Sequence, residues 1–180
     1  MKRLHENAAR ILQEWSHPES AQCALRDEYL VFIDEHPDAM SRTCAPGHLT
    51  ASALVIDESR RNVLLTLHPK VGRWLQLGGH VEPEDASLQA AAVREAVEEG
   101  GIEPIWISEA PVRLDRHAVP CRAVGMTHHL DCQYLAVVPD GSPAVISDES
   151  DDLQWFPLDD LPAGLDVSVL ALCSAVTSPA

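Results

Sequence analysis

The segment Gly78–Ile102, GGHVEPEDASLQAAAVREAVEEGGI, carries the strongest structural signal in the sequence. Residues 85–99 are rich in alanine, leucine, glutamate and glutamine, which favour a helix. Gly100-Gly101 follows directly, and glycine at this place is a typical helix C-terminus. We therefore predict a helix over residues 85–99, preceded by a segment that contains Gly78-Gly79 and ended by Gly100-Gly101.

Three carboxylates gather on one face of this helix. At about 100° of rotation per residue, Glu95, Glu98 and Glu99 project within about 100° of one another. A solvated acidic face would account for them, but Arg94 sits beside them and can orient a carboxylate. Converging oxygen ligands suit Mg²⁺ or Mn²⁺, and Gly79 lets a backbone carbonyl come close as a further ligand. The pattern indicates a metal site and leaves the solvated face as the simpler interpretation.

With these residues in place, the segment resembles the Nudix box, G-x5-E-x7-R-E-U-x-E-E-x-G-U, where U is a bulky aliphatic residue. Gly79 opens the match, residues 94–102 fit its second half, and Asp85 stands where the family has glutamate. Eight residues rather than seven separate Asp85 from Arg94. If Asp85 lies in a loop before the helix, the extra residue is absorbed and the Asp85–Arg94 pair survives. If Asp85 lies inside the helix, the pair is rotated out of phase.

The resemblance, which extends over about residues 49–161, implies an activity. It implies hydrolysis of a pyrophosphate bond in a nucleoside diphosphate linked to another moiety, by attack of water on phosphorus. The cofactor would be Mg²⁺ or Mn²⁺. By matching position, the metal ligands would be Glu95, Glu98, Glu99 and the carbonyl of Gly79.

The same resemblance assigns the other roles. Glu98 or Glu99 would help to deprotonate the water, and Arg94 and Asp85 would form an orienting pair. Family members often recruit one more carboxylate from a late loop, as base or ligand, and for that role we select Glu149 from the acidic run at residues 148–152.

The fold class implied is α/β, a Nudix-type α/β/α sandwich with a mixed sheet, preceded by an N-terminal helical extension. We place the extension at residues 1–45 and the Nudix domain at residues 46–180. Apolar spacing predicts a helix from Leu4 to Trp15 and a second from about residue 19 to 35, with Ser16 as its N-cap. The extension is interpreted as a packing appendage, with a lid or a dimer contact as alternatives. Further strands are expected at residues 48–57, 62–68, 105–107, 112–118, 128–138 and 153–156, and a last helix at 166–175.

Six other residues are weaker candidates for substrate binding. Basic or imidazole side chains can contact phosphate or sugar, and an indole can stack on a base. Each also has a purely structural explanation, as a loop or core residue. These candidates are His68, Lys70, Arg73, Trp74, His80 and His128.

Composition narrows the partners. The net charge of −15 disfavours binding to duplex nucleic acid, which rewards cationic surfaces. No apolar run is long enough to span a membrane, and no secretory signal is recognisable, so we expect a cytoplasmic protein. The five cysteines form no CxxC pair and are expected to be reduced, and the cluster of His117, Cys121, His128 and His129 fits no common zinc spacing. The expected partner is a small diphosphate, with a homodimer possible in addition.

Two other functions stay open from the sequence. A catalytically silent Nudix-fold module that senses a nucleotide is disfavoured because all three box glutamates remain. An isomerase-type relative acting on a prenyl diphosphate would need an active-site cysteine, for which Cys44, Cys121 and Cys132 are available but unsupported. The metal-dependent hydrolase is the leading hypothesis.

Overall fold

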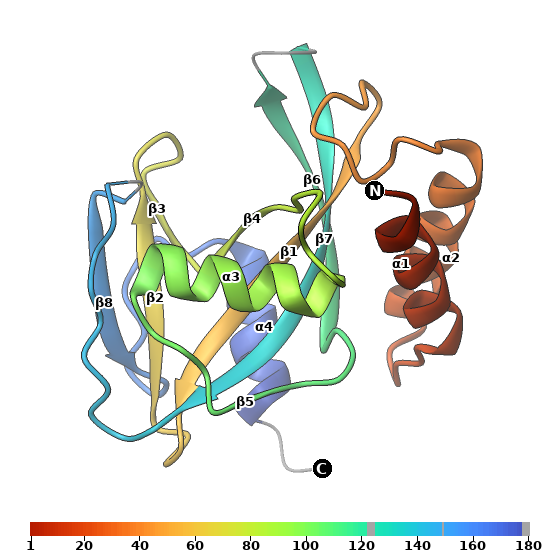
Figure 1. Ribbon diagram of the computed structural model, residues 1–180. Coiled ribbons are helices and arrows are strands. Elements are labelled where there is room, and N and C mark those ends of the chain that lie inside the picture. Colours follow the sequence, from red (N-terminus) through yellow and green to blue (C-terminus); the bar gives the residue numbers. More distant parts are fainter. Residues whose placement is uncertain (122–124, 149, 178–180) are drawn as a thin grey trace.

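A computed structural model describes residues 1–121, 125–148 and 150–177, in which one mixed sheet carries helices on both faces (Figure 1). The helices are α1 (Lys2–Glu14), α2 (Ser20–Glu35), α3 (Leu88–Gly100) and α4 (Val167–Thr177). The strands are β1 (His48–Asp57), β2 (Asn62–His68), β3 (Arg73–Leu75), β4 (Leu77–His80), β5 (Trp106–Ile107), β6 (Arg113–Cys121), β7 (Gly125–Val138) and β8 (Asp152–Pro157). Among these described residues, no helix is both long and apolar enough to cross a bilayer.

The sheet is organised around β1. Its whole length pairs in parallel with β7, from His48 opposite His129 to Asp57 opposite Val138. Its other edge is divided between β4, beside the first half of β1, and β2, beside the second half. The remaining pairs are antiparallel: β3 and β8 flank β2, while β5 and β6 pair with β7. This division of one strand edge brings β4, which carries the box glycines, into the middle of the sheet.

The sheet separates two apolar cores. On one face, alternate residues of β1 and β7 pack under α3 and the N-terminal helices. On the other face, Leu54 and Ile56 of β1 and Leu135 of β7 pack under α4. Figure 1 shows α3 and α4 on opposite sides of the strands. This arrangement confirms the predicted α/β/α layers with a mixed sheet.

The box helix is shorter at its start than the sequence predicts. Its first turn begins at Leu88 rather than at Asp85, because Ser87 is extended and its hydroxyl accepts a 3.0 Å hydrogen bond from the Ala90 amide. Its end is as expected: Gly101 adopts the left-handed conformation, with φ 62°, that glycine tolerates best. The residues between Asp85 and Ser87 are therefore loop.

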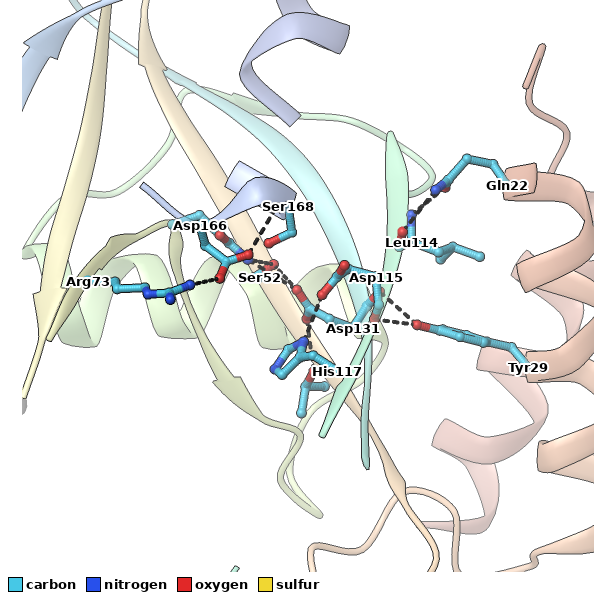
Figure 2. A network of polar contacts seen from close by, with 12 residues as sticks. Gln22, Tyr29, Ser52, Arg73, Leu114, Asp115, His117, Asp131, Asp166 and Ser168 are labelled. Atoms are coloured by element: carbon cyan, nitrogen blue, oxygen red, sulfur yellow. Dashed lines mark hydrogen bonds and ion pairs between the residues drawn. The ribbon is translucent and has the colours of Figure 1, made fainter. Parts of the chain in front are cut away.

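The N-terminal helices dock against β6 at the edge of the sheet. The side-chain amide of Gln22 makes two hydrogen bonds with the backbone of Leu114, of 2.8 and 3.0 Å. Tyr29 donates to the carbonyl of Asp115 at 2.6 Å, and both α2 residues approach the strand from the same side (Figure 2). The expected Ser16 cap is wrong: α2 begins at Ser20 after an extended Glu19.

Two further elements differ from expectation. The segment from Arg73 to His80, which is not among the expected strands, forms β3 and β4; Gln76 separates them and turns its side chain toward Ser52 and Asp131. Strand β7 begins three residues earlier than predicted, at Gly125, and pairs with β6 over its extra length.

Candidate active site

Arg94 is the centre of the polar contacts at the box. Its guanidinium donates to both oxygens of Asp85, at 3.1 and 3.0 Å, and to the His80 carbonyl at 2.8 Å. It also donates to Glu95 at 3.0 Å and to Glu98 at 2.8 Å. The hydrogen bonds that Arg94 donates to Asp85 raise the pKa of Arg94, although burial acts in the opposite direction. One half-buried cation thus contacts three carboxylates of this segment.

Asp85 lies in the loop before α3, so the extra residue of the box is absorbed there. Its side chain is 6% exposed, and besides Arg94 it accepts a 2.7 Å hydrogen bond from the Glu82 amide. This amide bond fixes the loop that holds the aspartate in place. The two-pronged Asp85–Arg94 contact therefore forms in spite of the changed spacing.

Glu95 lies directly against the backbone of β4. A Cβ atom built on Gly79 would come within 2.7 Å of a Glu95 carboxylate oxygen. Such a distance is impossible for a real side chain, so this contact requires glycine at position 79. The carboxylate of Glu95 is consequently buried beside the Gly79 backbone, which was expected to supply a carbonyl ligand.

Glu99 is held by a different contact. The Gly78 amide donates a 2.9 Å hydrogen bond to one of its oxygens, and the side chain is almost fully buried. Glu98, in contrast, has a side chain that is 57% exposed. Two of the three glutamates therefore face β4 rather than solvent, so a solvated acidic face describes Glu98 alone.

The donor set fits a hard divalent cation. Arg94 contacts three carboxylates and can neutralise one negative charge, so this group keeps an excess of negative charge. Carboxylate oxygens are the ligands that Mg²⁺ and Mn²⁺ prefer. Within the described residues, however, the glutamates of the box do not bring three ligand atoms within 4.8 Å of one another. Glu95 and Glu98 are drawn toward Arg94, while Glu99 is bound to the β4 backbone.

A polar patch occupies the face of the sheet opposite α3, beside the part that α4 covers. Asp131 is buried there and accepts hydrogen bonds from Thr50 at 2.9 Å, Ser52 at 2.6 Å and Gln76 at 3.3 Å. Burial raises the pKa of Asp131. Figure 2 shows His117 and Asp115 next to it, joined by a 2.7 Å contact that raises the pKa of His117.

Four histidines adjoin this patch. The rings of His48, His80 and His129 lie 4.8 to 5.1 Å apart, and His117 lies 5.4 Å from His129. Burial, with His80 next in importance, lowers the pKa of His48 to about 4, against a smaller opposite effect of the Cys44 backbone. Burial and the neighbouring histidines lower the pKa of His129 to about 3. The pKa of His80 falls as well, through burial and then through Arg42 and Lys70.

Four other weak candidates lie on β2, β3 and the loop between them, and their side chains or backbone contact other residues of the chain: His68, Lys70, Arg73 and Trp74. Arg73 donates to Asp166 at 3.0 Å, and Asp166 also accepts from the Ser168 amide at the start of α4 (Figure 2). Trp74 packs edge-on against Phe156 in the core beneath α4, with ring centres 4.8 Å apart. His68 accepts from the amide of exposed Lys70 at 3.2 Å. None of these contacts joins them to the Arg94 group.

His128 lies on the other face of β7 from the polar patch. Side chains alternate along a strand, so His129 faces His117 while His128 turns toward α2. There it lines a groove of about 640 Å³ together with Phe32 and Leu130. His128, one of the weak substrate-binding candidates, therefore lies on the other face of the sheet from His117 and Asp131. Glu149 lies outside the described residues and stays a prediction.

The structure offers little to an isomerase. Cys132 is completely buried, and burial raises the pKa of its thiol. Cys44 is also buried, and its pKa is raised to about 11, first by burial and then by Asp38. Burial and a raised pKa keep both thiols protonated, whereas such chemistry uses a reactive thiolate. The side chain of Cys121 is outside the described part of the chain.

Sequence reasoning missed the residues that share a face with His80. His48, Ser52 and Gln76 received no role, and His129 was grouped only with His117, Cys121 and His128. Strand alternation was the available signal, since His48, Thr50 and Ser52 are three polar residues at a spacing of two in one predicted strand. Their partners on β4 and β7 depend on pairing between distant segments, which spacing alone does not reveal.

Comparison with known proteins identifies the family of this chain. A family model described as the NUDIX domain matches residues 46–171. Among solved structures, the MutT NUDIX hydrolase from Burkholderia pseudomallei is 26% identical, with a TM-score of 0.57, over 73% of this chain and 98% of that one. A NUDIX-family hydrolase from Clostridium perfringens is 23% identical, with a TM-score of 0.58, over 72% of this chain and 95% of that one.

A third similar structure is the NUDIX domain of Shewanella oneidensis NrtR complexed with ADP ribose, which is 23% identical with a TM-score of 0.54 and coverage of 71% and 84%. A comparison with curated proteins found no significant match. The family model covers well over half of the 180 residues, and the box residues are joined in the contacts described above. The chain belongs to the NUDIX domain family.

Proposed function

We propose that this chain is a metal-dependent pyrophosphohydrolase that cleaves a nucleoside diphosphate linked to another moiety. The observation that carries the proposal is the Arg94 group, in which one guanidinium holds Asp85, Glu95 and Glu98 at 2.8 to 3.1 Å. A binding module has no need to orient so many carboxylates around one spot. Family membership supports the same reaction class.

The residues that would hold Mg²⁺ or Mn²⁺ are Glu95, Glu98, Glu99 and the carbonyl of Gly79. Such an ion neutralises diphosphate oxygens and lowers the pKa of a bound water. The protein's own part is positioning: Arg94 orients Glu95, and the Gly78 amide orients Glu99. Fixed charges of this kind supply most of the rate in phosphoryl transfer.

Proton removal from the attacking water is assigned to Glu98 or Glu99. Glu98 is the more exposed of the two, so it can exchange a proton with solvent. Glu99 has one oxygen bound to the Gly78 amide and a second that this bond does not use. Glu149 is the third candidate for a base or a ligand.

The test is a product assay on a panel of nucleoside triphosphates, ADP-ribose, nucleotide sugars and dinucleoside polyphosphates, with Mg²⁺ or Mn²⁺. We expect metal-dependent cleavage of one class and a loss of at least ~100-fold in kcat for Glu99→Gln, because it removes a charged ligand. The matched control is Glu103→Gln, an exposed glutamate just beyond α3, which should keep full activity. A folded wild type that binds a panel member without turning it over would replace this proposal with the sensing module.

A further inference from the structure

Three histidines from three different strands converge on the face of the sheet away from α3. His48 is on β1, His80 on β4 and His129 on β7. Strand pairing brings them together, since His48 is opposite His129 and His80 is opposite Thr50, two residues along β1. One ring nitrogen from each lies within 4.8 Å of the other two.

The innermost ring, that of His48, lacks regular hydrogen bonds. His48 is completely buried, and neither of its ring nitrogens has a hydrogen-bond partner among the described residues. A buried neutral imidazole normally gives one hydrogen bond and accepts another. An orphaned buried imidazole costs free energy unless an unseen ligand satisfies it. His80 and His129 are only partly buried, so the cluster opens toward solvent on their side.

We propose that His48, His80 and His129 bind one divalent transition-metal ion of the zinc class, with a fourth position open to water or another ligand. Three protein nitrogens with an open fourth position is a common arrangement for Zn²⁺. Bonds of about 2.0–2.1 Å in a tetrahedron place the nitrogens about 3.3 Å apart. The observed spread of up to 4.8 Å therefore closes by small rotations of the two outer rings.

This site is separate from the carboxylates of the box. Gly79 turns the position of its missing side chain toward Glu95, and the next residue, His80, projects to the opposite side of β4. The ligand types differ too, because imidazole suits Zn²⁺, whereas carboxylates suit Mg²⁺. Arg42 and Lys70 lie close enough to lower the pKa of His80, and their positive charges oppose binding of any cation, so the affinity of this site has to come from the imidazole nitrogens.

The proposed metal would join the strands that carry the box. It would link β1, β4 and β7, and β4 also presents Gly78 to Glu99 and the His80 carbonyl to Arg94. Metal binding should therefore stabilise the fold as well as this strand arrangement. That gives a readout that does not depend on catalytic activity.

The test uses tag-free, full-length protein that has been stripped of metal with a chelator. Zn²⁺ is titrated by calorimetry, and Co²⁺ serves as a spectroscopic probe. We expect one Zn²⁺ per chain, visible Co²⁺ bands typical of nitrogen ligation, and a raised Tm on adding Zn²⁺. His80→Gln and His129→Gln should each weaken Zn²⁺ binding by at least ~100-fold, because even loss of an outer-shell partner weakens metal binding about 10–100-fold.

Two controls separate this site from its alternatives. His128→Gln removes the neighbouring histidine on the other face of β7 and should leave Zn²⁺ binding unchanged. Cys44→Ser should also have no effect, since Cys44 belongs to a different group of possible ligands with His36 and Asp38. Binding that survives both His80→Gln and His129→Gln, or a sulfur-to-cobalt charge-transfer band, would overturn the proposal.

Discussion

At Gly79, the lack of a side chain lets a buried carboxylate lie against the β4 backbone. The Glu95 oxygens occupy the space where a Cβ atom would be, at 2.7 to 3.0 Å. Arg94 holds the same carboxylate from the side at 3.0 Å. The position of Glu95 is thus fixed by one residue that is charged and one that is small.

We predict that Gly79→Ala lowers kcat by at least ~100-fold, because a shift of about 1 Å at a catalytic site is enough for that loss. The fold should survive, since Glu95 is a flexible side chain that can move aside. The measurement is turnover of the substrate identified by the panel, with circular dichroism to check folding. Gly141→Ala is the control, because nothing lies within 4 Å of its new Cβ, and the strain of alanine at its φ of 75° should lower stability and leave kcat unchanged; equal losses of kcat in the two variants would refute the steric argument.

Asp57 stabilises the turn between β1 and β2 through several hydrogen bonds to one carboxylate. Its carboxylate accepts from the amides of Arg61 and Asn62, at 2.8 and 3.2 Å, and from the Asn62 side chain at 2.6 Å. Burial acts to raise the pKa of Asp57, but these hydrogen bonds outweigh it and the pKa is lowered.

A lowered pKa in the folded state means stability that is present above the unfolded pKa of about 3.9 and lost as the pH falls through the folded value. Asp57→Asn should therefore cost about 1–3 kcal/mol at neutral pH, and the gap to wild type should narrow below about pH 3.9. Urea unfolding at a series of pH values measures this gap. The exposed Asp159→Asn should show almost no gap at any pH; a constant gap for Asp57→Asn would mean that its charge is unimportant.

At the scale of elements, α2 is attached to β6 mainly through side chains that bond to backbone. Gln22 satisfies both the amide and the carbonyl of Leu114. The neighbouring charged pair of Arg113 and Glu19, at 2.6 Å, is more exposed and contributes less.

We predict that Gln22→Ala lowers the free energy of unfolding by about 1–3 kcal/mol, because it leaves two buried backbone groups unsatisfied. Alanine is a better helix former than glutamine, so the loss cannot come from helix propensity. Chemical denaturation measures it. Gln13→Ala, on the exposed side of α1, is the control and should change stability by less than about 0.5 kcal/mol. Equal values for the two variants would contradict the role given to Gln22.

The elements themselves were largely predictable from the sequence. The strands His48–Asp57 and Asn62–His68 follow the predicted bounds, because their apolar runs end at a polar turn. The start of α3 was missed by three residues, since helix-forming composition does not show where Ser87 will cap it. The sequence left the Asp85–Arg94 contact as one of two alternatives, because composition does not show that Asp85 lies in a loop before α3.

Contacts between distant segments were less predictable. Which of His128 and His129 joins the polar patch depends on the phase of β7, and a one-residue change reverses it. The grouping of His48 with His80 depends on β4 pairing with the first half of β1. Local spacing predicts neither, because both follow from register across the sheet.

At the scale of the whole molecule, the N-terminal helices share their core with the sheet. Eight buried apolar residues before position 45 belong to the same cluster as β1, β7 and α3: Leu4, Ala8, Leu12, Trp15, Tyr29, Ile33, Ala39 and Met40. The family model nevertheless begins at residue 46. Residues 46–171, which the family model matches, therefore pack against helices that lie outside the match.

We predict that a chain lacking residues 1–45 is insoluble or unfolds without cooperativity. Each of the six large buried side chains contributes about 1.5–3 kcal/mol, and together they are comparable to the 5–15 kcal/mol that typically separates folded from unfolded states. Solubility and thermal unfolding of the shortened chain test this. A soluble product within about 2 kcal/mol of the full chain would show that residues 46–180 fold alone.

The amide pair of Gln22 has one more consequence. An edge strand with open peptide groups is a template on which another chain can add a strand, and such addition leads to aggregation. At Leu114 the glutamine side chain takes the place that a foreign peptide unit would occupy, donating and accepting as a backbone does. An added strand would have to displace α2 before it could pair there. The Gln22 side chain alone thus protects this stretch of the sheet edge from self-association.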